Sequence, residues 1–300
     1  MTKTKMNMVQ GRYAGRMSLR TDIALRLIGR SFDKRFRYAR LTRLPLMGKA
    51  MEYAFFGGDS MIILPKEDVF IQRAVRTIEM DVQVRPENIV LPSQVIDHFI
   101  DRSEYIFLMD KCICRDSNHC QDYPKEIGCI FLGRGANRIP GKRGRLVGKD
   151  EAKEHMRKGR EAGLVNLIGR DKIDSVVFAT GPSSELLSIC SCCPCCCLWK
   201  MVPDLAPAIS STLIRMPGLE VQVVEGKCKG CGQCIESSVC YVRAMTLVDG
   251  KVSIDDQLCK GCARCVEFCK HEAIRLVIKD PRFIEESIRR IEPLVDITSR

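Results

Sequence analysis

Eight of the eighteen cysteines in this chain of 300 residues fall into two short, regular motifs. The first motif spans residues 228–240 and the second spans residues 259–269, and both begin with the spacing CxxCxxC. This spacing lets three successive thiolates reach one metal cluster, while the fourth ligand must come from elsewhere in the chain. Zinc sites pair one CxxC with another and do not need CxxCxxC twice. The two motifs therefore predict two 4Fe–4S clusters.

The two motifs resemble the bacterial-type two-cluster ferredoxin domain over about residues 219–280. The resemblance implies that each motif lends its last cysteine to the other motif's cluster. It assigns one cluster to Cys228, Cys231, Cys234 and Cys269, and the other to Cys259, Cys262, Cys265 and Cys240. Two features depart from the family. Five residues, where the family has three, precede Cys240, and Tyr241 and Lys270 stand where the family has proline.

The other ten cysteines lie in two segments whose spacings match no two-cluster ferredoxin. They are Cys112, Cys114, Cys120 and Cys129 in the first segment, and Cys190, Cys192, Cys193, Cys195, Cys196 and Cys197 in the second. Since one cubane takes four thiolates, ten cysteines suffice for one or two further iron–sulfur clusters. We expect the two segments to meet in space and share such a site. The alternatives are a structural zinc site and free reduced thiols.

A strand geometry would divide these cysteines by face. Residues i and i+2 of an extended segment share a face, so Cys112 and Cys114 are expected to reach one centre. The same rule places Cys190 and Cys192 on one face of the second segment, and Cys193, Cys195 and Cys197 on the other. His119 beside Cys120 is more typical of a surface loop than of a ligand.

A wider resemblance covers most of the chain. The stretches "CICR", "GCIFLG" and "CCPCCCLW" are similar to poorly characterised iron–sulfur proteins of anaerobes, in which such a region precedes a ferredoxin module. This resemblance implies a redox protein and says little about mechanism.

The net charge of +11 comes from the N-terminal arm, residues 1–50. Within it, Leu19, Ile23 and Leu27 recur at helical spacing, and four arginines lie largely off this stripe: Arg16, Arg20, Arg26 and Arg30. The favoured interpretation is a helix that packs its stripe on its own domain and keeps a solvated basic face. The alternative is docking on an acidic redox partner protein or peripherally on a membrane surface.

Apolar periodicity and turn residues predict an α+β fold. Strands are expected at "SMIILP", "TIEMDVQV", "GLVNLIG" and "IDSVVFATG", and helices after Ser93, near residues 150–162 and in "PRFIEESIRRIEPL". The predicted organisation is a basic arm (1–50), a cysteine-rich α/β domain (51–202), a two-cluster ferredoxin domain (219–280) and a C-terminal helix (281–300). Prolines between residues 201 and 218 indicate the boundary.

Composition and motifs limit the functions. No apolar run approaches the ~18 residues of a membrane span, and the N-terminus lacks the apolar core of a secretory signal, so we expect a cytoplasmic protein with reduced thiols. We find no flavin, nicotinamide or nucleotide motif, which favours an electron carrier over a self-contained reductase. An iron–sulfur oxidoreductase with its substrate at residues 190–197 is the alternative. Nucleic-acid binding through the basic arm and the helix near residues 150–162 is not favoured.

Overall fold

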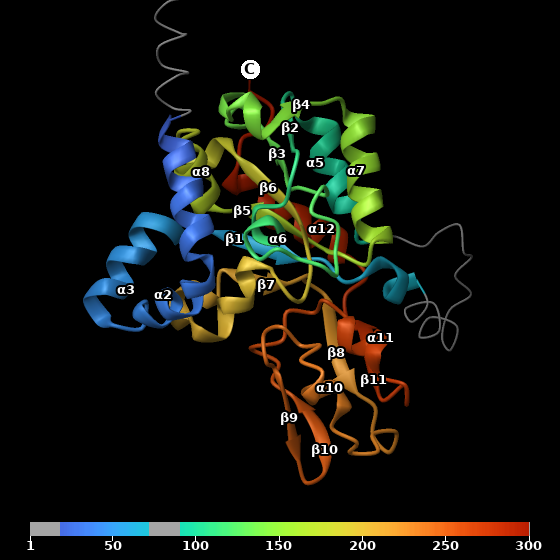
Figure 1. Cartoon of the computed structure of the whole chain (residues 1–300). Helices are drawn as coiled ribbons and strands as arrows, with labels where there is room; N and C mark the ends of the chain where they lie inside the picture. The colour runs from blue at the N-terminus through green and yellow to red at the C-terminus, as the bar shows by residue number, and fades with distance from the viewer. Residues whose placement is uncertain (1–18, 72–90, 300) are drawn as a thin grey trace, which may run out of the picture.

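The computed structural model describes residues 19–71 and 91–299 (Figure 1). It contains helices and mixed sheets, which confirms the predicted α+β class. The strand expected at "TIEMDVQV", residues 77–84, lies outside the described residues. None of the described helices combines the length and the apolar character that crossing a membrane requires.

A seven-stranded sheet forms the centre of the larger part of the molecule. Its strands in spatial order are β4 (Gly144–Leu146), β2 (Ile106–Met109), β3 (Ile130–Leu132), β6 (Leu187–Cys192), β5 (Val165–Arg170), β1 (Ser60–Ile63) and β7 (Leu213–Arg215). Neighbours pair antiparallel except β1 and β7, which run parallel. The predicted strands at residues 60–63 and 165–170 are therefore present.

Each face of this sheet packs against different helices. Alternation along the strands sends Ile62, Ile168 and Ile189 to a core shared with three helices: α5 (Gln94–Arg102), α7 (Lys149–Glu161) and α12 (Phe283–Ile291). These are the three helices that the sequence predicted. The opposite face carries Met61, Val165 and other residues that pack against the N-terminal helices and residues 197–209.

The helix at residues 19–31 packs on the domain through a different face from the one we predicted. Residues 19–31 are helical and are followed by η1 (Phe32–Lys34), α2 (Arg35–Leu41), α3 (Pro45–Met51) and the π-helix η2 (Glu52–Phe56). The expected packing of Leu19, Ile23 and Leu27 on the domain is wrong, because their side chains are 61%, 50% and 59% exposed. The helix contacts the domain through another face, on which buried Thr21 donates to the Phe178 carbonyl.

The segment "IDSVVFATG" was also predicted wrongly. Its residues form helix α8 (Lys172–Phe178) in place of a strand. The Asp171 side chain caps the helix by accepting from the amide of Ile173 at 3.1 Å, and Ala179 ends it in a left-handed conformation. Capping and tertiary packing therefore outweigh the β propensity of the paired valines.

The C-terminal part below the large sheet in Figure 1 contains two small sheets. Strands β8 (Leu219–Val223) and β11 (Ile274–Ile278) pair antiparallel, and β9 (Met245–Val248) and β10 (Lys251–Ile254) form a hairpin. Helices α10 (Gln233–Glu236) and α11 (Arg264–Phe268) lie within the two cysteine motifs. The shorter remaining elements are α6 (Ile113–Ser117), η4 (Ala136–Arg138), η5 (Gly141–Arg143), η6 (Ser183–Glu185), η7 (Leu198–Asp204), α9 (Pro207–Ser210) and η8 (Glu292–Leu294).

After β11 the chain returns to the large sheet. Helix α12 packs beside α5, and the ring centroids of Phe283 and Phe70 lie 5.4 Å apart. After α12, the Ile297 carbonyl accepts from the amide of Glu104. The C-terminal helix therefore completes the core of the larger part, although it follows the cysteine motifs in sequence.

Candidate metal centres

The two C-terminal cysteine motifs have matching backbone geometry. Gly230 and Gly261 have φ values of 65° and 67°, and Gly232 and Ala263 follow with 70° and 63°. These left-handed turns wrap the chain between successive cysteines and lead into α10 and α11. The insertion before Cys240 is accommodated after α10, where Ser238 also adopts positive φ.

The cysteines of the two motifs gather in an exchanged arrangement. Cys228, Cys231 and Cys234 line a small cavity together with Cys269 of the other motif. Burial, followed by the thiolates of Cys262, Cys259 and Cys240, raises the pKa of Cys265, so these four lie near one another. The ligand sets implied by the resemblance are thus brought together, and the ligation itself stays a prediction.

Backbone amides point at these sulfurs. Ala244 donates to Cys240 Sγ at 3.3 Å, Ala273 to Cys269 Sγ at 3.4 Å and Val252 to Cys228 Sγ at 3.5 Å. Such bonds stabilise thiolates and tune the potential of a bound cluster. The donor set and its amides fit an iron–sulfur cluster.

Residues 252–275 match the family model for the 4Fe–4S binding domain. The matched residues include the whole second motif, so the C-terminal part of the chain contains a 4Fe–4S binding domain. Comparisons with curated proteins and with solved structures gave no significant match.

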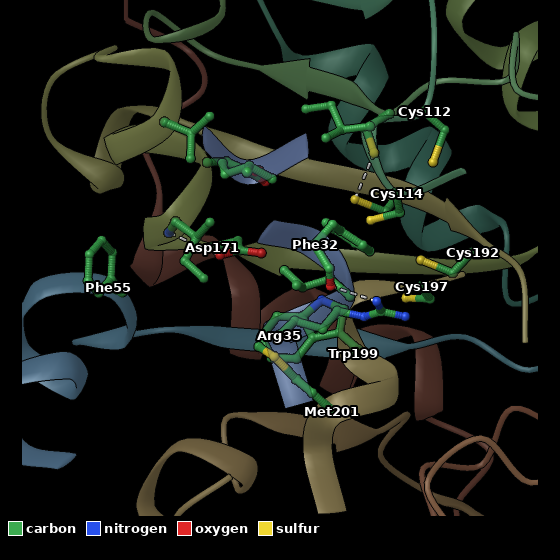
Figure 2. Close-up of a pocket in the computed structure, with 18 of the residues that line it drawn as sticks. Phe32, Arg35, Phe55, Cys112, Cys114, Asp171, Cys192, Cys197, Trp199 and Met201 are labelled. Carbon is green, nitrogen blue, oxygen red and sulfur yellow. Dashed lines mark hydrogen bonds between the residues drawn. The ribbon is translucent and has the colours of Figure 1, made fainter. Parts of the chain in front are cut away.

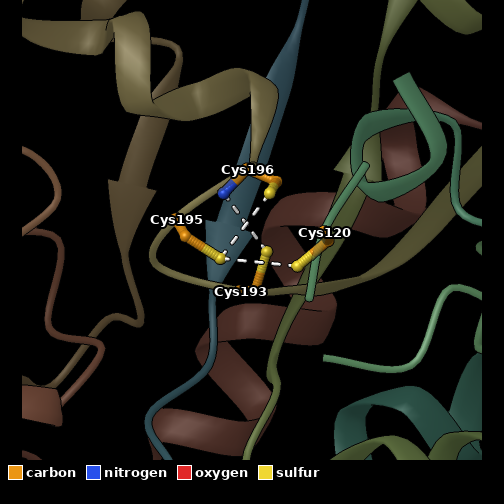
Figure 3. A group of neighbouring side chains, drawn as sticks. All are labelled: Cys120, Cys193, Cys195 and Cys196. Carbon is orange, nitrogen blue, oxygen red and sulfur yellow. Dashed lines mark hydrogen bonds between the residues drawn. The ribbon is translucent and has the colours of Figure 1, made fainter. Parts of the chain in front are cut away.

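Outside the 4Fe–4S binding domain, the ten other cysteines divide into two sets that the sequence did not distinguish. The first, which we call the four-thiol group, consists of Cys120, Cys193, Cys195 and Cys196, whose Sγ atoms all lie within 4.8 Å of one another (Figure 3). The second surrounds a cavity of about 330 Å³, which we call the six-thiol cavity (Figure 2). Its six cysteines are Cys112, Cys114, Cys129, Cys190, Cys192 and Cys197, and Cys193 of the four-thiol group also reaches its wall.

Strand β6 and the segment after it explain this division. Cys190 and Cys192 share a face of β6, as predicted, and pack toward the cavity side of the sheet. The chain turns after Cys192, so Cys193 and Cys195 join the four-thiol group while Cys197 returns to the cavity. The prediction that Cys197 shares a face with Cys193 and Cys195 is therefore wrong.

The first cysteine segment also differs from the extended geometry we expected. Cys112 precedes the short helix α6 and Cys114 lies within it. The two thiols still meet, because Cys112 keeps the extended conformation of a helix N-cap and its side chain forms a hydrogen bond with that of Cys114. His119 does not belong to the four-thiol group.

Thiols in the cavity are hydrogen-bonded in pairs. Cys129 Sγ lies 3.0 Å from Cys190 Sγ. A hydrogen bond from Cys114 lowers the pKa of Cys112 to about 6, and the same bond followed by burial raises the pKa of Cys114. Cys197 and Cys192 form a similar pair, in which the bond lowers the pKa of Cys197 and raises that of Cys192. In each of these two pairs one thiol readily becomes a thiolate, the form that binds metal.

Two buried arginines hold the cavity walls. The fully buried guanidinium of Arg115 donates to the carbonyls of Pro124, Ser191 and Ile127, which joins the first cysteine segment to β6. Arg35 stacks over the rings of Phe32 and Phe36 at 4.4 Å and lies near the cavity thiols (Figure 2). Both cations favour thiolate charge in an otherwise apolar space.

The cavity has a second end, away from its cysteines. In Figure 2, Phe55 and Asp171 lie across the cavity from the labelled cysteines. Burial raises the pKa of Asp171 well above its usual value and that of Asp174, which also lines the cavity, to about 6. Asp171 can therefore hold a proton at neutral pH, and Asp174 does so mainly below about pH 6.

The six-thiol cavity adjoins the 4Fe–4S binding domain. Trp199 and Tyr241 share one buried cluster with cysteines from both sites: Cys190, Cys192, Cys197, Cys240, Cys259 and Cys262. Arg264, inside the second motif, donates to the Cys192 carbonyl at 2.9 Å, and the amide of Lys66 donates to the Cys262 carbonyl at 3.1 Å. Within the described residues the buried hydroxyl of Tyr241 has no hydrogen-bond partner.

Sequence reasoning identified the cysteines and missed the residues around them. Arg115, Arg35, Asp174 and Trp199 carry no local signal of their position, because the sheet brings them to the cavity from distant segments. Tyr241 was noticed only as a departure from proline.

Proposed function

We propose that this protein transfers single electrons between two 4Fe–4S clusters in residues 219–280 and a further iron–sulfur centre in the six-thiol cavity, and exchanges them with a partner redox protein. The observation that carries the proposal is the shared buried cluster in which cysteines of the cavity and of the second motif pack around Trp199 and Tyr241. Iron–sulfur clusters supply reversible one-electron transfer at potentials that their surroundings set.

Residues at the junction support a short route between the two sites. Arg264 is buried and bonds the backbone of Cys192, so the second motif and the cavity wall are fixed relative to each other. Lys66 strengthens the same junction through an ion pair with Glu267 at 2.6 Å. Tyr241 is enclosed among thiols of the two sites, and its buried hydroxyl has no hydrogen-bond partner within the described residues.

The opposite end of the 4Fe–4S binding domain is open to solvent. Cys231 of the first motif is exposed, whereas the other seven motif cysteines are buried or half-buried. This asymmetry favours electron exchange with solution at the first motif and delivery to the cavity through the second.

Metal content tests this proposal. Anaerobically purified protein should contain about twelve irons and twelve sulfides per chain if the cavity holds one cubane beside the C-terminal pair. Replacing both Cys112 and Cys114 with Ser should reduce each count to about eight, and the EPR signals of the C-terminal clusters should persist. About eight irons in both proteins would contradict a cavity cluster.

We infer that the partner docks on the outer face of the helix at residues 19–31. Its inner face borders the cavity through Ile28 and Ser31, while its outer face presents Leu19, Ile23 and Leu27 beside exposed Arg20, Arg26 and Arg30. Asp22, the acidic residue of this helix, is paired with Lys142 and Arg143. An acidic protein with an apolar centre complements this face, and it would lie one helix away from the cavity.

Salt dependence tests the docking face. Replacing Arg20, Arg26 and Arg30 with Gln should slow reduction of an acidic electron-carrier protein and flatten the salt dependence of that rate, because exposed charges steer encounter and are screened within about 8–10 Å. Reduction of a neutral dye is the control and should not change. Equal effects on both acceptors would contradict docking, and salt-dependent sedimentation with anionic vesicles would indicate a membrane surface instead.

A second candidate function is reduction of a disulfide in the cavity. The end near Phe55, away from the cysteines, leaves room for a substrate, and the cavity volume of about 330 Å³ lies in the ~300–1,000 Å³ range of ligand pockets. Cleavage of one S–S bond would consume two electrons from the iron–sulfur centres and two protons, for which Asp171 and Asp174 are suitably placed donors. Anaerobic mixing of reduced protein with a small aromatic disulfide should then reoxidise the clusters and release thiol, and no reoxidation would leave the carrier function alone.

A further inference from the structure

The spacing of the four-thiol group is that of ligands to one metal ion. Cys195 Sγ lies 3.7 Å from Cys120 Sγ and 3.6 Å from Cys196 Sγ. Four thiolates at about 2.3 Å from a tetrahedral zinc ion lie about 3.8 Å from one another, by the geometry of the tetrahedron. The two Sγ–Sγ distances from Cys195 agree with this value.

An iron–sulfur cubane requires wider spacing, because each of its four thiolates binds a different iron. The eight cysteines of the C-terminal motifs provide the comparison within the same chain. In the part that the structure describes, no three of them, and no three cysteines confined to the six-thiol cavity, gather within 4.8 Å as the four-thiol group does. The four-thiol group therefore differs from the C-terminal motifs, and also from the six-thiol cavity, whose thiols approach one another in pairs.

The surroundings of the four-thiol group are those of a closed structural site. Cys120, Cys193 and Cys196 are buried, and Cys195 is half-buried. The amide of Cys196 donates to Cys193 Sγ at 3.3 Å, and the amides of Asp122 and Tyr123 donate to Cys120 Sγ. In Figure 3 the four side chains point toward a common centre. All four ligand positions are filled by protein, which leaves none for substrate or water.

We propose that Cys120, Cys193, Cys195 and Cys196 bind a single divalent thiophilic ion, zinc being the ion that their geometry and softness fit best, and that this ion is structural. It joins the turn after β6 to the loop after α6, the same two segments that Arg115 links. The site is independent of the electron-transfer proposal, because it needs no sulfide and no change of oxidation state.

Metal and sulfide analysis on the full-length protein tests the proposal. Purified chain should contain one zinc, or one further iron without matching sulfide, beyond its cluster iron. Replacing both Cys120 and Cys195 with Ser should remove this one ion and leave acid-labile sulfide unchanged. The matched control, Ser at Cys112 and Cys114, should leave this ion in place. Loss of about four sulfides from the Cys120/Cys195 variant would overturn the proposal.

A conservative variant separates ligand loss from misfolding. Cys195→His keeps four zinc donors and should retain the ion, since zinc accepts a Cys₃His set. Cobalt supplied in place of zinc should give the intense visible bands of a tetrahedral tetrathiolate in the wild type, and altered bands in Cys195→His. Failure of the wild type to bind cobalt or zinc at one ion per chain would also overturn the proposal.

Discussion

The eight cysteines of residues 228–269 and the ten of residues 112–197 are positioned by different means. In the C-terminal motifs, short loops with left-handed turns at Gly230 and Gly261 present three thiols each, so local sequence determines the geometry. In the N-terminal part, strands distant in sequence bring single cysteines to one place, as the contact between Cys129 and Cys190 shows. Spacing therefore identifies the first kind of site and cannot identify the second.

The largest expected effect tests whether the two regions load metal independently. Replacing Cys259 and Cys262 with Ser should remove about four irons and four sulfides from the 4Fe–4S binding domain. Because the cavity has its own six thiols, its iron should remain, as measured by iron analysis and EPR spin counting. Loss of all iron would show that the regions assemble as one unit.

The next effect concerns the residue that holds the N-terminal site together. Arg115→Met leaves the carbonyls of Pro124, Ser191 and Ile127 without their buried donor and should cost about 3–5 kcal/mol of local stability. Native-state hydrogen exchange should show faster exchange in residues 112–129 and little change in residues 219–280. The matched control is Arg102→Met on the exposed end of α5, and equal destabilisation by both variants would contradict the role of Arg115.

The two regions should also respond to pH with opposite signs. Burial raises the pKa of Asp174 to about 6, so the folded state binds its proton more tightly than the unfolded state does. Stability should fall by about 1–3 kcal/mol as pH rises from about 4 through 6, and Asp174→Asn should flatten this change.

The side chain of Asp256, in the C-terminal part of the molecule, should respond to pH in the opposite direction. A hydrogen bond from Arg215 lowers its pKa, so its stabilising contribution is present above the usual carboxyl pKa and is lost as pH falls. Asp256→Asn should therefore weaken the C-terminal part slightly at neutral pH and have no effect in strong acid. Hydrogen exchange of the two regions across this pH range would measure both changes, and the same sign in both would contradict the contrast.

The smallest expected effect is at the junction. Tyr241→Phe removes a buried hydroxyl dipole that lies among thiols of both sites, and it should lower the midpoint potential of an adjoining cluster by about 20–60 mV, the equivalent of roughly 1 kcal/mol. Redox titration followed by EPR measures the shift. Tyr53→Phe on the surface is the control, and equal potentials in all three proteins would place the hydroxyl outside the electron route.

The sequence predicted those elements and site residues whose structure depends on neighbouring residues in the chain. Helix α7 and strand β5 follow apolar periodicity and were predicted well, as were the motif cysteines. Helix α8 was mistaken for a strand because its cap, Asp171, and its packing decided the outcome. The division of residues 190–197 between two sites depends on one turn after β6, which strand parity could not reveal. The outward stripe of Leu19, Ile23 and Leu27 was misjudged because amphipathicity does not say which surface a helix contacts.

The return of the chain to the large sheet after β11 makes the 4Fe–4S binding domain an insertion with two attachments. It enters after β7, which pairs with β1, and leaves into α12, where Phe283 meets Phe70. Beyond α12, the Asp296 amide donates to the Ser184 carbonyl. A domain on a single linker could swing away from the cavity, whereas two attachments restrict both translation and rotation. A single proteolytic cut between β7 and β8 would leave the fragments associated through α12, and the spacing between the redox sites would survive the break.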